Sequence, residues 1–200
     1  GSGAVLSAVY NRIKELRYIT GLGAPRESGR RHRILTTHPA AVFSYQNVLS
    51  SLSMMRELRF LSARRVLESV DHSTLPPDDV ELYLQLSTLA RAYDEWENFN
   101  PDRFLEYYGK VRFEKELLRV FRLNDDALAA VEALVAERAS QQPGPHIITD
   151  MFNNAARRLV SGRNEDAFAR LYRALEMLAQ WVLMRDFGLD TNDLDTRRIP

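Results

Sequence analysis

The spacing of apolar and polar residues predicts a chain that is mostly helical from Ser44 onward. Apolar side chains recur there every three or four positions, which is the spacing of one face of an α-helix. The breaks between these segments carry residues that end or begin helices, such as Pro76-Pro77 and Pro101. The pattern predicts helices over residues 45–55, 57–70, 78–98, 101–109, 111–122, 125–140, 146–161 and 164–187.

The first 43 residues follow a different pattern. Residues 4–16 have the apolar spacing of a short amphipathic helix. Residues 17–20 and 31–37 favour strands on either side of a glycine-containing loop. One helix and two strands cannot cover a sheet, so we interpret residues 1–43 as the end of an α/β domain.

The last two predicted helices form an αα-hairpin with almost no loop. Gly162 suits the left-handed position that ends the first of these helices, and Asn164 suits the cap of the second. Packing in the hairpin accounts for the amphipathic start of the second helix, but its segment 177–184, MLAQWVLM, is apolar on nearly every side. Two neighbouring helices, or one neighbour and a second subunit, would have to cover that segment. The apolar face of the helix carries Phe168, Leu171, Leu175, Leu178 and Val182, and the polar face carries Asp166, Arg170, Arg173, Glu176 and Gln180.

The stretch QQPGP at 141–145 is the strongest internal boundary, because prolines and glycine end helices. We therefore expect three parts: the end of an α/β domain at 1–43, a helical connector at 44–142 and a helical domain at 143–200. The predicted fold class is mainly α, a multi-helix array with a terminal αα-hairpin, preceded by a short helix and β-hairpin remnant of an α/β domain.

Composition narrows the classes of function. Lys and Arg together number 27, as do Asp and Glu, so no net charge draws the chain to nucleic acid, a membrane or acidic substrates. The absence of cysteine excludes disulfides, thiol catalysis and cysteine-bound zinc, and it favours a cytoplasmic location. No apolar run approaches the roughly 18–20 residues that cross a bilayer, so we expect no membrane contact.

The residues that could carry chemistry form no recognisable catalytic or metal motif. The four histidines lack zinc-site spacing, so we expect neither a metal nor a cofactor. Arg33 and His38 have the spacing R-x4-H of some ribonucleases, but they lie in an extended segment, and we interpret the match as accidental. Asp94 and Glu97 could serve acid–base chemistry, yet an exposed helical face produces the same pattern.

Two further clusters allow more than one interpretation. The loop at 26–33 contains Arg30 and Arg31, which could contact phosphates or could form a solubilising tip. The aromatic residues between Tyr83 and Tyr108 could stack on bases, but packing across a helix corner is the simpler interpretation.

Three stretches together resemble a protein family. ELRYITGLGAPRESGRRHR (15–33) is similar to the final strands of a CARF domain, and LARAYDEWENFNPDRFLEYY (89–108) is similar to a helical linker. The most specific stretch is ITDMFNNAARRLVSGRNEDAFARLYRALEMLAQWVLMRDFGLDTNDLD (148–195), which looks like the first helical hairpin of a HEPN domain. The chain thus resembles the CRISPR-associated accessory proteins of type III systems that join CARF, linker and HEPN domains.

This resemblance implies a ribonuclease of antiviral defence that is activated by a cyclic oligoadenylate and acts as a homodimer on RNA. The HEPN catalytic motif R-x4-6-H lies on a later helix, which we expect beyond Pro200, so no catalytic residue is assigned and we expect no cleavage by this chain alone. The resemblance implies ligand contacts at Arg30, Arg31 and the glycine-rich start Gly1, Ser2 and Gly3, although a cloning remnant would have the same sequence.

Two other functions remain open at this point. The chain could be a helical interaction or dimerisation module without catalysis, with an interface at Leu178, Trp181 and Val182. Alternatively, the basic loop could bind nucleic acid without any reaction.

Overall fold

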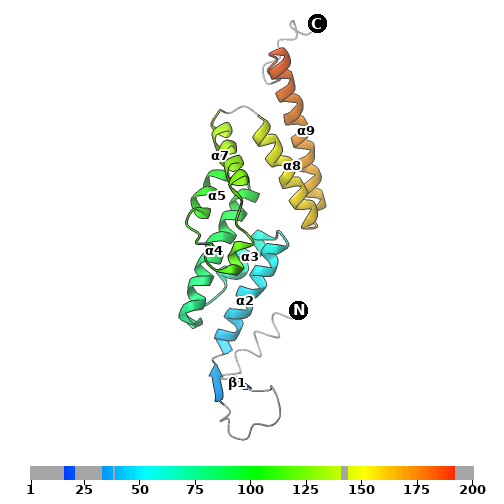
Figure 1. Ribbon diagram of the computed structural model, residues 1–200. Coiled ribbons are helices and arrows are strands. Elements are labelled where there is room, and N and C mark those ends of the chain that lie inside the picture. Colours follow the sequence, from blue (N-terminus) through cyan, green and yellow to red (C-terminus); the bar gives the residue numbers. More distant parts are fainter. Residues whose placement is uncertain (1–15, 21–32, 38, 141–143, 192–200) are drawn as a thin grey trace, which may run out of the picture.

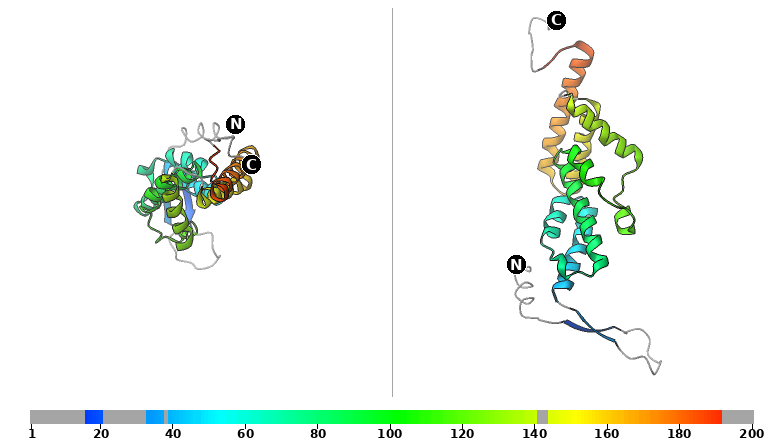
Figure 2. Two further views of the ribbon diagram at one scale, coloured as in Figure 1. Left: turned by 90° about the horizontal axis from the view of Figure 1, so that it is seen from above. Right: turned by 90° about the vertical axis from the view of Figure 1, so that its left-hand side faces the viewer.

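The computed structural model describes residues 16–20, 33–37, 39–140 and 144–191. The described part of the chain is elongated, with the strands at one end and the last helix at the other (Figure 1 and Figure 2). The helix expected at 4–16 lies outside the described residues, as do the tip of the hairpin loop and the last residues of the chain.

Two short strands pair as the sequence predicts. Strand β1 (Leu16–Thr20) lies antiparallel to β2 (Arg33–Thr37), and Leu16 is opposite Thr37. The hairpin expected from residues 17–20 and 31–37 is therefore confirmed.

The rest of the described chain is mostly helical, which confirms the mainly α fold class. Prolines occupy the first turn of α4, α5 and α8, where their missing N–H leaves no hydrogen bond unmade. The side chain of Asn124 accepts a hydrogen bond from the Ala127 N–H at 2.8 Å, which confirms it as the cap of α7. The helices are α2 (Pro39–Arg56), α3 (Phe60–Glu68), α4 (Pro77–Glu97), α5 (Pro101–Tyr108), α6 (Glu116–Arg119), α7 (Asp125–Ala139), α8 (Pro145–Val160) and α9 (Asn164–Phe187), with a 3-10 turn η1 (His72–Thr74) before α4.

The prediction of a continuous helix over residues 111–122 is wrong, since only α6 within this segment is helical. Side chains from outside this segment bind its backbone. The Tyr93 hydroxyl donates to the Phe121 carbonyl at 2.5 Å, and the Gln85 side chain accepts from the Arg112 N–H at 2.7 Å. Both backbone groups lie near the ends of the expected helix, where even a continuous helix leaves N–H and C=O groups unpaired, so these tertiary contacts hold the two ends of the segment against α4.

An aromatic cluster fills the corner between α4 and α5, which confirms the packing interpretation of these residues. Phe104 is fully buried at its centre, with its ring 4.7 Å from Trp96, 5.0 Å from Tyr108 and 5.6 Å from Tyr93. The cluster belongs to a continuous apolar core that runs from Val48 in α2 to Val131 in α7. The connector helices therefore form one packed body.

Replacing Phe104 with alanine should lower the free energy of unfolding by about 3–5 kcal/mol, because it leaves a cavity among the surrounding rings. Urea denaturation measures the loss. The matched control is Val120→Ala, since Val120 is 63% exposed and its loss should change stability by less than about 0.5 kcal/mol. Equal effects of the two changes would contradict the assignment of Phe104 to the core.

Candidate functional site

The α8–α9 hairpin turns at Gly162. Its φ angle of 77° is left-handed, as the sequence predicts. The Gly162 N–H donates to the Leu159 carbonyl and the Arg163 N–H to the Arg158 carbonyl, at 3.0 and 2.9 Å, which closes the end of α8. Asn164 is not the cap of α9, contrary to expectation: Arg163 occupies that position, no side chain bonds there, and Asn164 is the first helical residue.

Small side chains form the contact between α8 and α9. Ala155 in α8 and Ala167 and Ala174 in α9 are buried, together with Met177. Small residues let two helix backbones approach closely, so the hairpin does not need the large apolar side chains of α9 for its own packing.

The large apolar side chains of α9 face outward instead. Phe168 is 68% exposed, Tyr172 67% and Leu175 52%, and Leu171 and Leu178 lie beside them at the exposed surface. The expectation that packing within the hairpin accounts for this face is therefore wrong. We call these five residues the α9 apolar face. An exposed apolar surface of this kind is typical of a site that contacts another protein.

The end of α9 extends past its partner helix. Helix α9 has 24 residues and α8 has 16, so α9 is longer by about 12 Å, and Figure 1 shows its last turns beyond the start of α8. Trp181 and Val182 lie in this extension and are half-buried, with the Arg185 guanidinium 4.4 Å from the Trp181 ring. No described helix covers this segment on all sides.

A left-handed residue ends α4 beside the hairpin. Phe99 has a φ angle of 60°, an unfavourable conformation for a side chain other than glycine. The Phe99 N–H donates to the Trp96 carbonyl and the Asn100 N–H to the Glu95 carbonyl. This turn leaves the Glu97 carbonyl without a partner in α4, so it can accept hydrogen bonds from side chains outside the helix.

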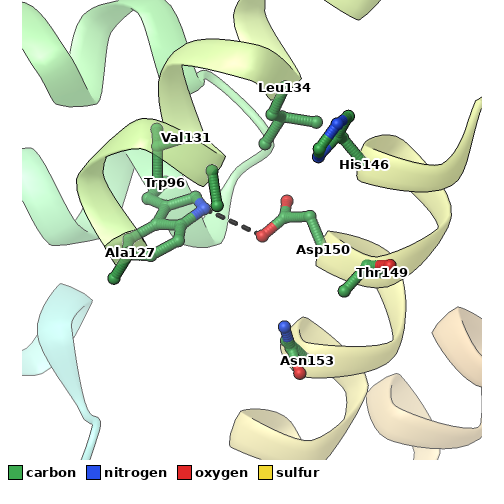
Figure 3. A pocket seen from close by; sticks show the side chains of 9 residues that line it. Trp96, Ala127, Val131, Leu134, His146, Thr149, Asp150 and Asn153 are labelled. Carbon is green, nitrogen blue, oxygen red and sulfur yellow. Dashed lines mark hydrogen bonds between the residues drawn. The ribbon is translucent and has the colours of Figure 1, made fainter. Parts of the chain in front are cut away.

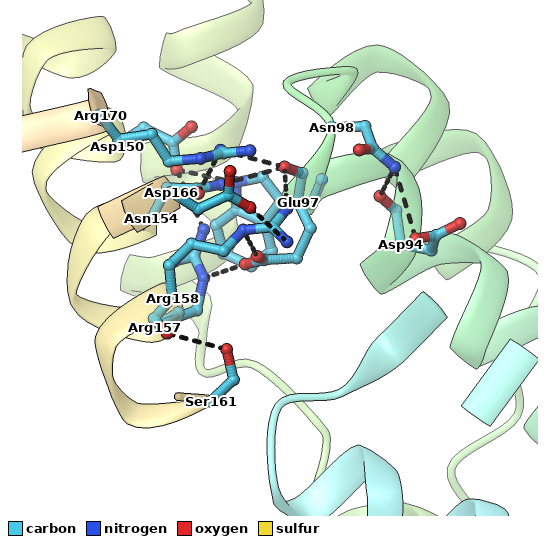
Figure 4. A network of polar contacts seen from close by, with 11 residues as sticks. Asp94, Glu97, Asn98, Asp150, Asn154, Arg157, Arg158, Ser161, Asp166 and Arg170 are labelled. Atoms are coloured by element: carbon cyan, nitrogen blue, oxygen red, sulfur yellow. Dashed lines mark hydrogen bonds and ion pairs between the residues drawn. The ribbon is translucent and has the colours of Figure 1, made fainter. Parts of the chain in front are cut away.

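Three side chains of the hairpin donate to the Glu97 carbonyl (Figure 4). Arg158 Nη2 donates at 3.0 Å, and Asn154 Nδ2 and Arg170 Nη1 each donate at 3.3 Å. Asn154 is fully buried and Arg158 is 5% exposed. Because carbonyls at a helix C-terminus carry partial negative charge, they are favourable partners for these two arginines.

The Glu97 carboxylate pairs with two arginines of α8. Arg157 Nε lies 2.5 Å from Oε1, and Arg158 Nε lies 3.1 Å from Oε2. The interpretation of Asp94 and Glu97 as part of an exposed face is wrong, because Glu97 is 6% exposed and Asp94 is 3% exposed. Asp94 pairs within the connector, 2.8 Å from Arg64.

Arg170 connects α9 to the same place. Its guanidinium lies 4.5 Å from the centre of the Phe99 ring and also donates to the Asn154 side-chain oxygen. Burial lowers the pKa of Arg170 from its ordinary value, while the charge of Glu97 opposes that change. Stacking on Phe99 and bonding to Glu97 thus turn this polar residue of α9 inward.

Asp150 in α8 reaches the other side of the α4 terminus. Its carboxylate accepts a hydrogen bond from the Trp96 indole at 2.9 Å and lies 3.8 Å from Arg157 Nη2. The Arg157 guanidinium also lies 4.9 Å from the Trp96 ring. Burial raises the pKa of Asp150 above its ordinary value, although Arg157 and the indole bond act in the opposite direction.

Two small cavities border Asp150 along the seam between α8 and the connector. One, of about 170 Å³, lies between Trp96, the α7 residues Val131 and Leu134, and Asp150 (Figure 3). The other, of about 120 Å³, is also lined by Asp150 and Leu134 and lies near Phe99 and Met151. Both cavities are partly open to the surface, so α8 and the connector do not close completely on each other beside Asp150.

The remaining predicted site residues fall in two groups. Gly1, Ser2, Gly3, Arg30 and Arg31 lie outside the described residues. Leu178 belongs to the α9 apolar face, while Trp181 and Val182 lie in the extension, so the structure puts the predicted interface residues on one helix.

Two classes of feature are absent from the part of the chain that the structure describes. Within those ranges, no three acidic or histidine side chains gather closely enough to hold a metal ion. None of the helices described combines the length and apolar character needed to span a bilayer.

Sequence reasoning missed the junction of Glu97 with Arg157, Arg158 and Arg170. The only signal was the adjacent pair Arg157-Arg158 in a helix that also carries the small polar residue Asn154. That pattern is equally typical of a solvated helix, so it could not identify a partner in α4.

One family model matches the chain. Residues 136–200 match the model described as the Csm6 HEPN domain. The matched range is less than half of the chain, begins near the end of α7 and contains all of α8 and α9. The match supports a CRISPR-associated HEPN protein. No curated protein and no solved structure matches the chain.

Replacing Asp150 with asparagine should leave the free energy of unfolding at neutral pH equal to or above that of the wild type. Since folding raises the pKa of this carboxyl, its contribution to stability is greatest at low pH and is lost as the pH rises through the folded pKa. Asparagine keeps an acceptor for Trp96 and removes the charge. The advantage should therefore shrink as the pH falls toward the ordinary range of a carboxyl group.

Urea denaturation across a pH series measures this difference. Glu165→Gln is the control, because Glu165 is an exposed residue of α9 and its change should alter stability by less than about 0.5 kcal/mol at each pH. A variant Asp150→Asn that is less stable than the wild type at pH 7 would contradict the prediction.

Proposed function

We propose that this chain is part of a CRISPR type III accessory effector whose complete protein is a ribonuclease activated by a cyclic oligoadenylate in antiviral defence. The observation that carries the proposal is the match of residues 136–200 to the Csm6 HEPN domain. That range contains the α8–α9 hairpin, the stretch whose sequence most resembles the HEPN family.

The proposal divides the chain into three parts. Residues 1–43 are the end of a CARF-like domain, residues 44–142 are the helical connector and residues 143–200 are the first half of a HEPN domain. Support for the second boundary comes from packing, because the apolar core from Val48 to Val131 does not include the hairpin. We place the effector in the cytoplasm, with RNA as its substrate.

In this proposal the ligand and catalytic residues are not on the described helices. The cyclic oligoadenylate binds through the complete CARF domain, with contacts from Gly1, Ser2, Gly3, Arg30 and Arg31. The catalytic arginine and histidine belong to a helix that follows the hairpin in the complete protein. The described helices then position the HEPN domain relative to the ligand domain.

The complete protein that contains this chain should cleave single-stranded RNA, with a rate that rises roughly 5- to 150-fold when the cyclic ligand binds. The measurement follows a labelled RNA with and without cyclic tetra-adenylate and cyclic hexa-adenylate. The chain of 200 residues by itself should not cleave RNA.

Two results would contradict this proposal. Strong cleavage by the 200-residue chain alone would show that the catalytic residues had been placed wrongly. Failure of the complete protein to cleave RNA with either ligand would reject an activated ribonuclease.

A second candidate function is a helical dimerisation module without catalysis, and the exposure of the α9 apolar face favours it. Phe168, Leu175 and Leu178 lie on one side of the helix, at a surface that no described element covers. Dimerisation also fits the first proposal, because the HEPN ribonucleases that the chain resembles act as dimers. The RNA assay separates the two functions, and the oligomeric state tests the surface itself.

Replacing Leu178 with aspartate should convert a dimer to monomers, because a charge would be buried at the interface that includes Trp181 and Val182. The dissociation constant should rise by at least about 30-fold, since losing a central interface residue typically costs on the order of 2 kcal/mol. Light scattering across a dilution series measures the change. Ala169→Asp is the matched control, because Ala169 is exposed on the polar side of α9. A mass that Leu178→Asp leaves unchanged would count against this interface.

A further inference from the structure

The hairpin and the connector have separate apolar interiors. The continuous core of α2 to α7 ends at Val131, and the buried apolar residues of the hairpin are not members of it. These hairpin residues are Ile148, Ala155, Ala167, Ala174 and Met177. The hairpin is therefore a second body, and something other than a shared apolar core must hold it against α4.

Charged and polar contacts hold the hairpin in place. The Glu97 carbonyl accepts from Asn154, Arg158 and Arg170, and the Glu97 carboxylate pairs with Arg157 and Arg158 (Figure 4). Every one of these donors comes from the hairpin, and every acceptor belongs to one residue at the end of α4. We call this set of contacts the Glu97 latch.

Besides the bond between Trp96 and Asp150, the hairpin has a second attachment at the opposite end of α8. The carboxylate of Glu137 in α7 accepts hydrogen bonds from the His146 and Ile147 N–H groups at 3.1 and 2.8 Å. A side chain at Gly144 would collide with it, because an added Cβ would lie 2.3 Å from the Glu137 Cδ. This contact fixes the start of α8 independently of Glu97, as a pivot would.

The packing between the two attachments is incomplete. The cavities of about 170 and 120 Å³ both lie along the seam and both border Asp150. The surfaces of α8 and the connector therefore do not contact each other at these two places.

We propose that the Glu97 latch is releasable, so that the α8–α9 hairpin has a docked arrangement and a released arrangement, related by movement about the Glu137 attachment. Release exposes the carboxylate of Glu97 and the guanidinium groups of Arg157, Arg158 and Arg170 to water. The device concerns the position of the hairpin and stands whether or not the complete protein cleaves RNA.

The energetics of buried ion pairs make such a device workable. Removing charges from water costs nearly as much as their attraction returns, so a buried pair contributes little net stability while it fixes one geometry. The left-handed Phe99 closes the turn that presents the Glu97 carbonyl, so the acceptor is held in one position by α4 itself. The docked arrangement is thus well defined in geometry without being strongly favoured in free energy.

Distances between two spin labels test the proposal directly. The chain contains no cysteine, so Arg65→Cys in α3 and Ala169→Cys in α9 provide the only labelling sites, and both residues are exposed. Dilution with unlabelled chain restricts the measured distances to one molecule. Pulsed dipolar spectroscopy should show one dominant distance in the wild type, with a minor population at a second distance.

Two variants address the two kinds of contact in the latch. Glu97→Gln removes the charge and keeps the backbone carbonyl, whereas Arg170→Met removes one donor to that carbonyl and keeps the aliphatic part of the side chain. Each should raise the ratio of released to docked populations by roughly tenfold or more, the factor expected for loss of one charge-assisted contact. Raising the salt concentration from about 0.05 M to about 1 M should shift the wild type in the same direction, because counterions stabilise the separated charges.

The matched control is Asp94→Asn. Asp94 is also a buried carboxylate of α4, but its partner Arg64 lies within the connector. This variant should lose stability and keep the wild-type distance distribution.

Two outcomes would overturn the latch. One is a wild-type distribution in Glu97→Gln and Arg170→Met when circular dichroism shows both to be folded. The other is an equal shift in Asp94→Asn. If neither latch variant folds, the salt titration of the wild type decides, and a distribution that does not respond to salt rejects the proposal.

Discussion

The acceptors of Glu97, at the end of α4, determine where the hairpin lies. A helix leaves its last carbonyls without partners, and burying such a group unpaired costs free energy. Helix α8 lies where its Asn154 and Arg158 satisfy the Glu97 carbonyl, and Arg170 of α9 completes the set. The need to pair one buried residue thus contributes, with the Glu137 attachment at the start of α8, to the orientation of two helices.

That arrangement has a consequence for the surface of the protein. Since Arg170, Ala167 and Ala174 occupy the inner side of α9, the larger apolar residues Phe168 and Leu175 remain outside. The same helix therefore presents one side to the connector through polar contacts and another to the surroundings through apolar ones. Helix α9 thus combines a polar junction on its inner side with an apolar surface on its outer side.

Local signals predicted most of the helices, because the prolines and Asn124 lie at helix starts and Gly162 lies just after a helix end. The failure at 111–122 has the opposite origin. The side chains of Tyr93 and Gln85, which belong to α4, donate to and accept from the backbone near the two ends of that segment, respectively. The prediction that the charged residues are exposed failed for the same reason, because Glu97 and Arg157 have the same sequence pattern whether they pair in the interior or face water.

The sequence by itself determined the helical character of the chain, the corner packing of its aromatic residues, and the hairpin that turns at Gly162. Only the tertiary structure decided which side of α9 faces inward. Apolar periodicity predicts burial from the free energy of transferring each side chain out of water, and on that basis Phe168 and Leu175 should be buried. The inner side is chosen instead by close helix approach at Ala167 and Ala174 and by the bond from Arg170 to the Glu97 carbonyl, a partner 73 residues earlier in the chain. A local pattern contains no information about a group that distant.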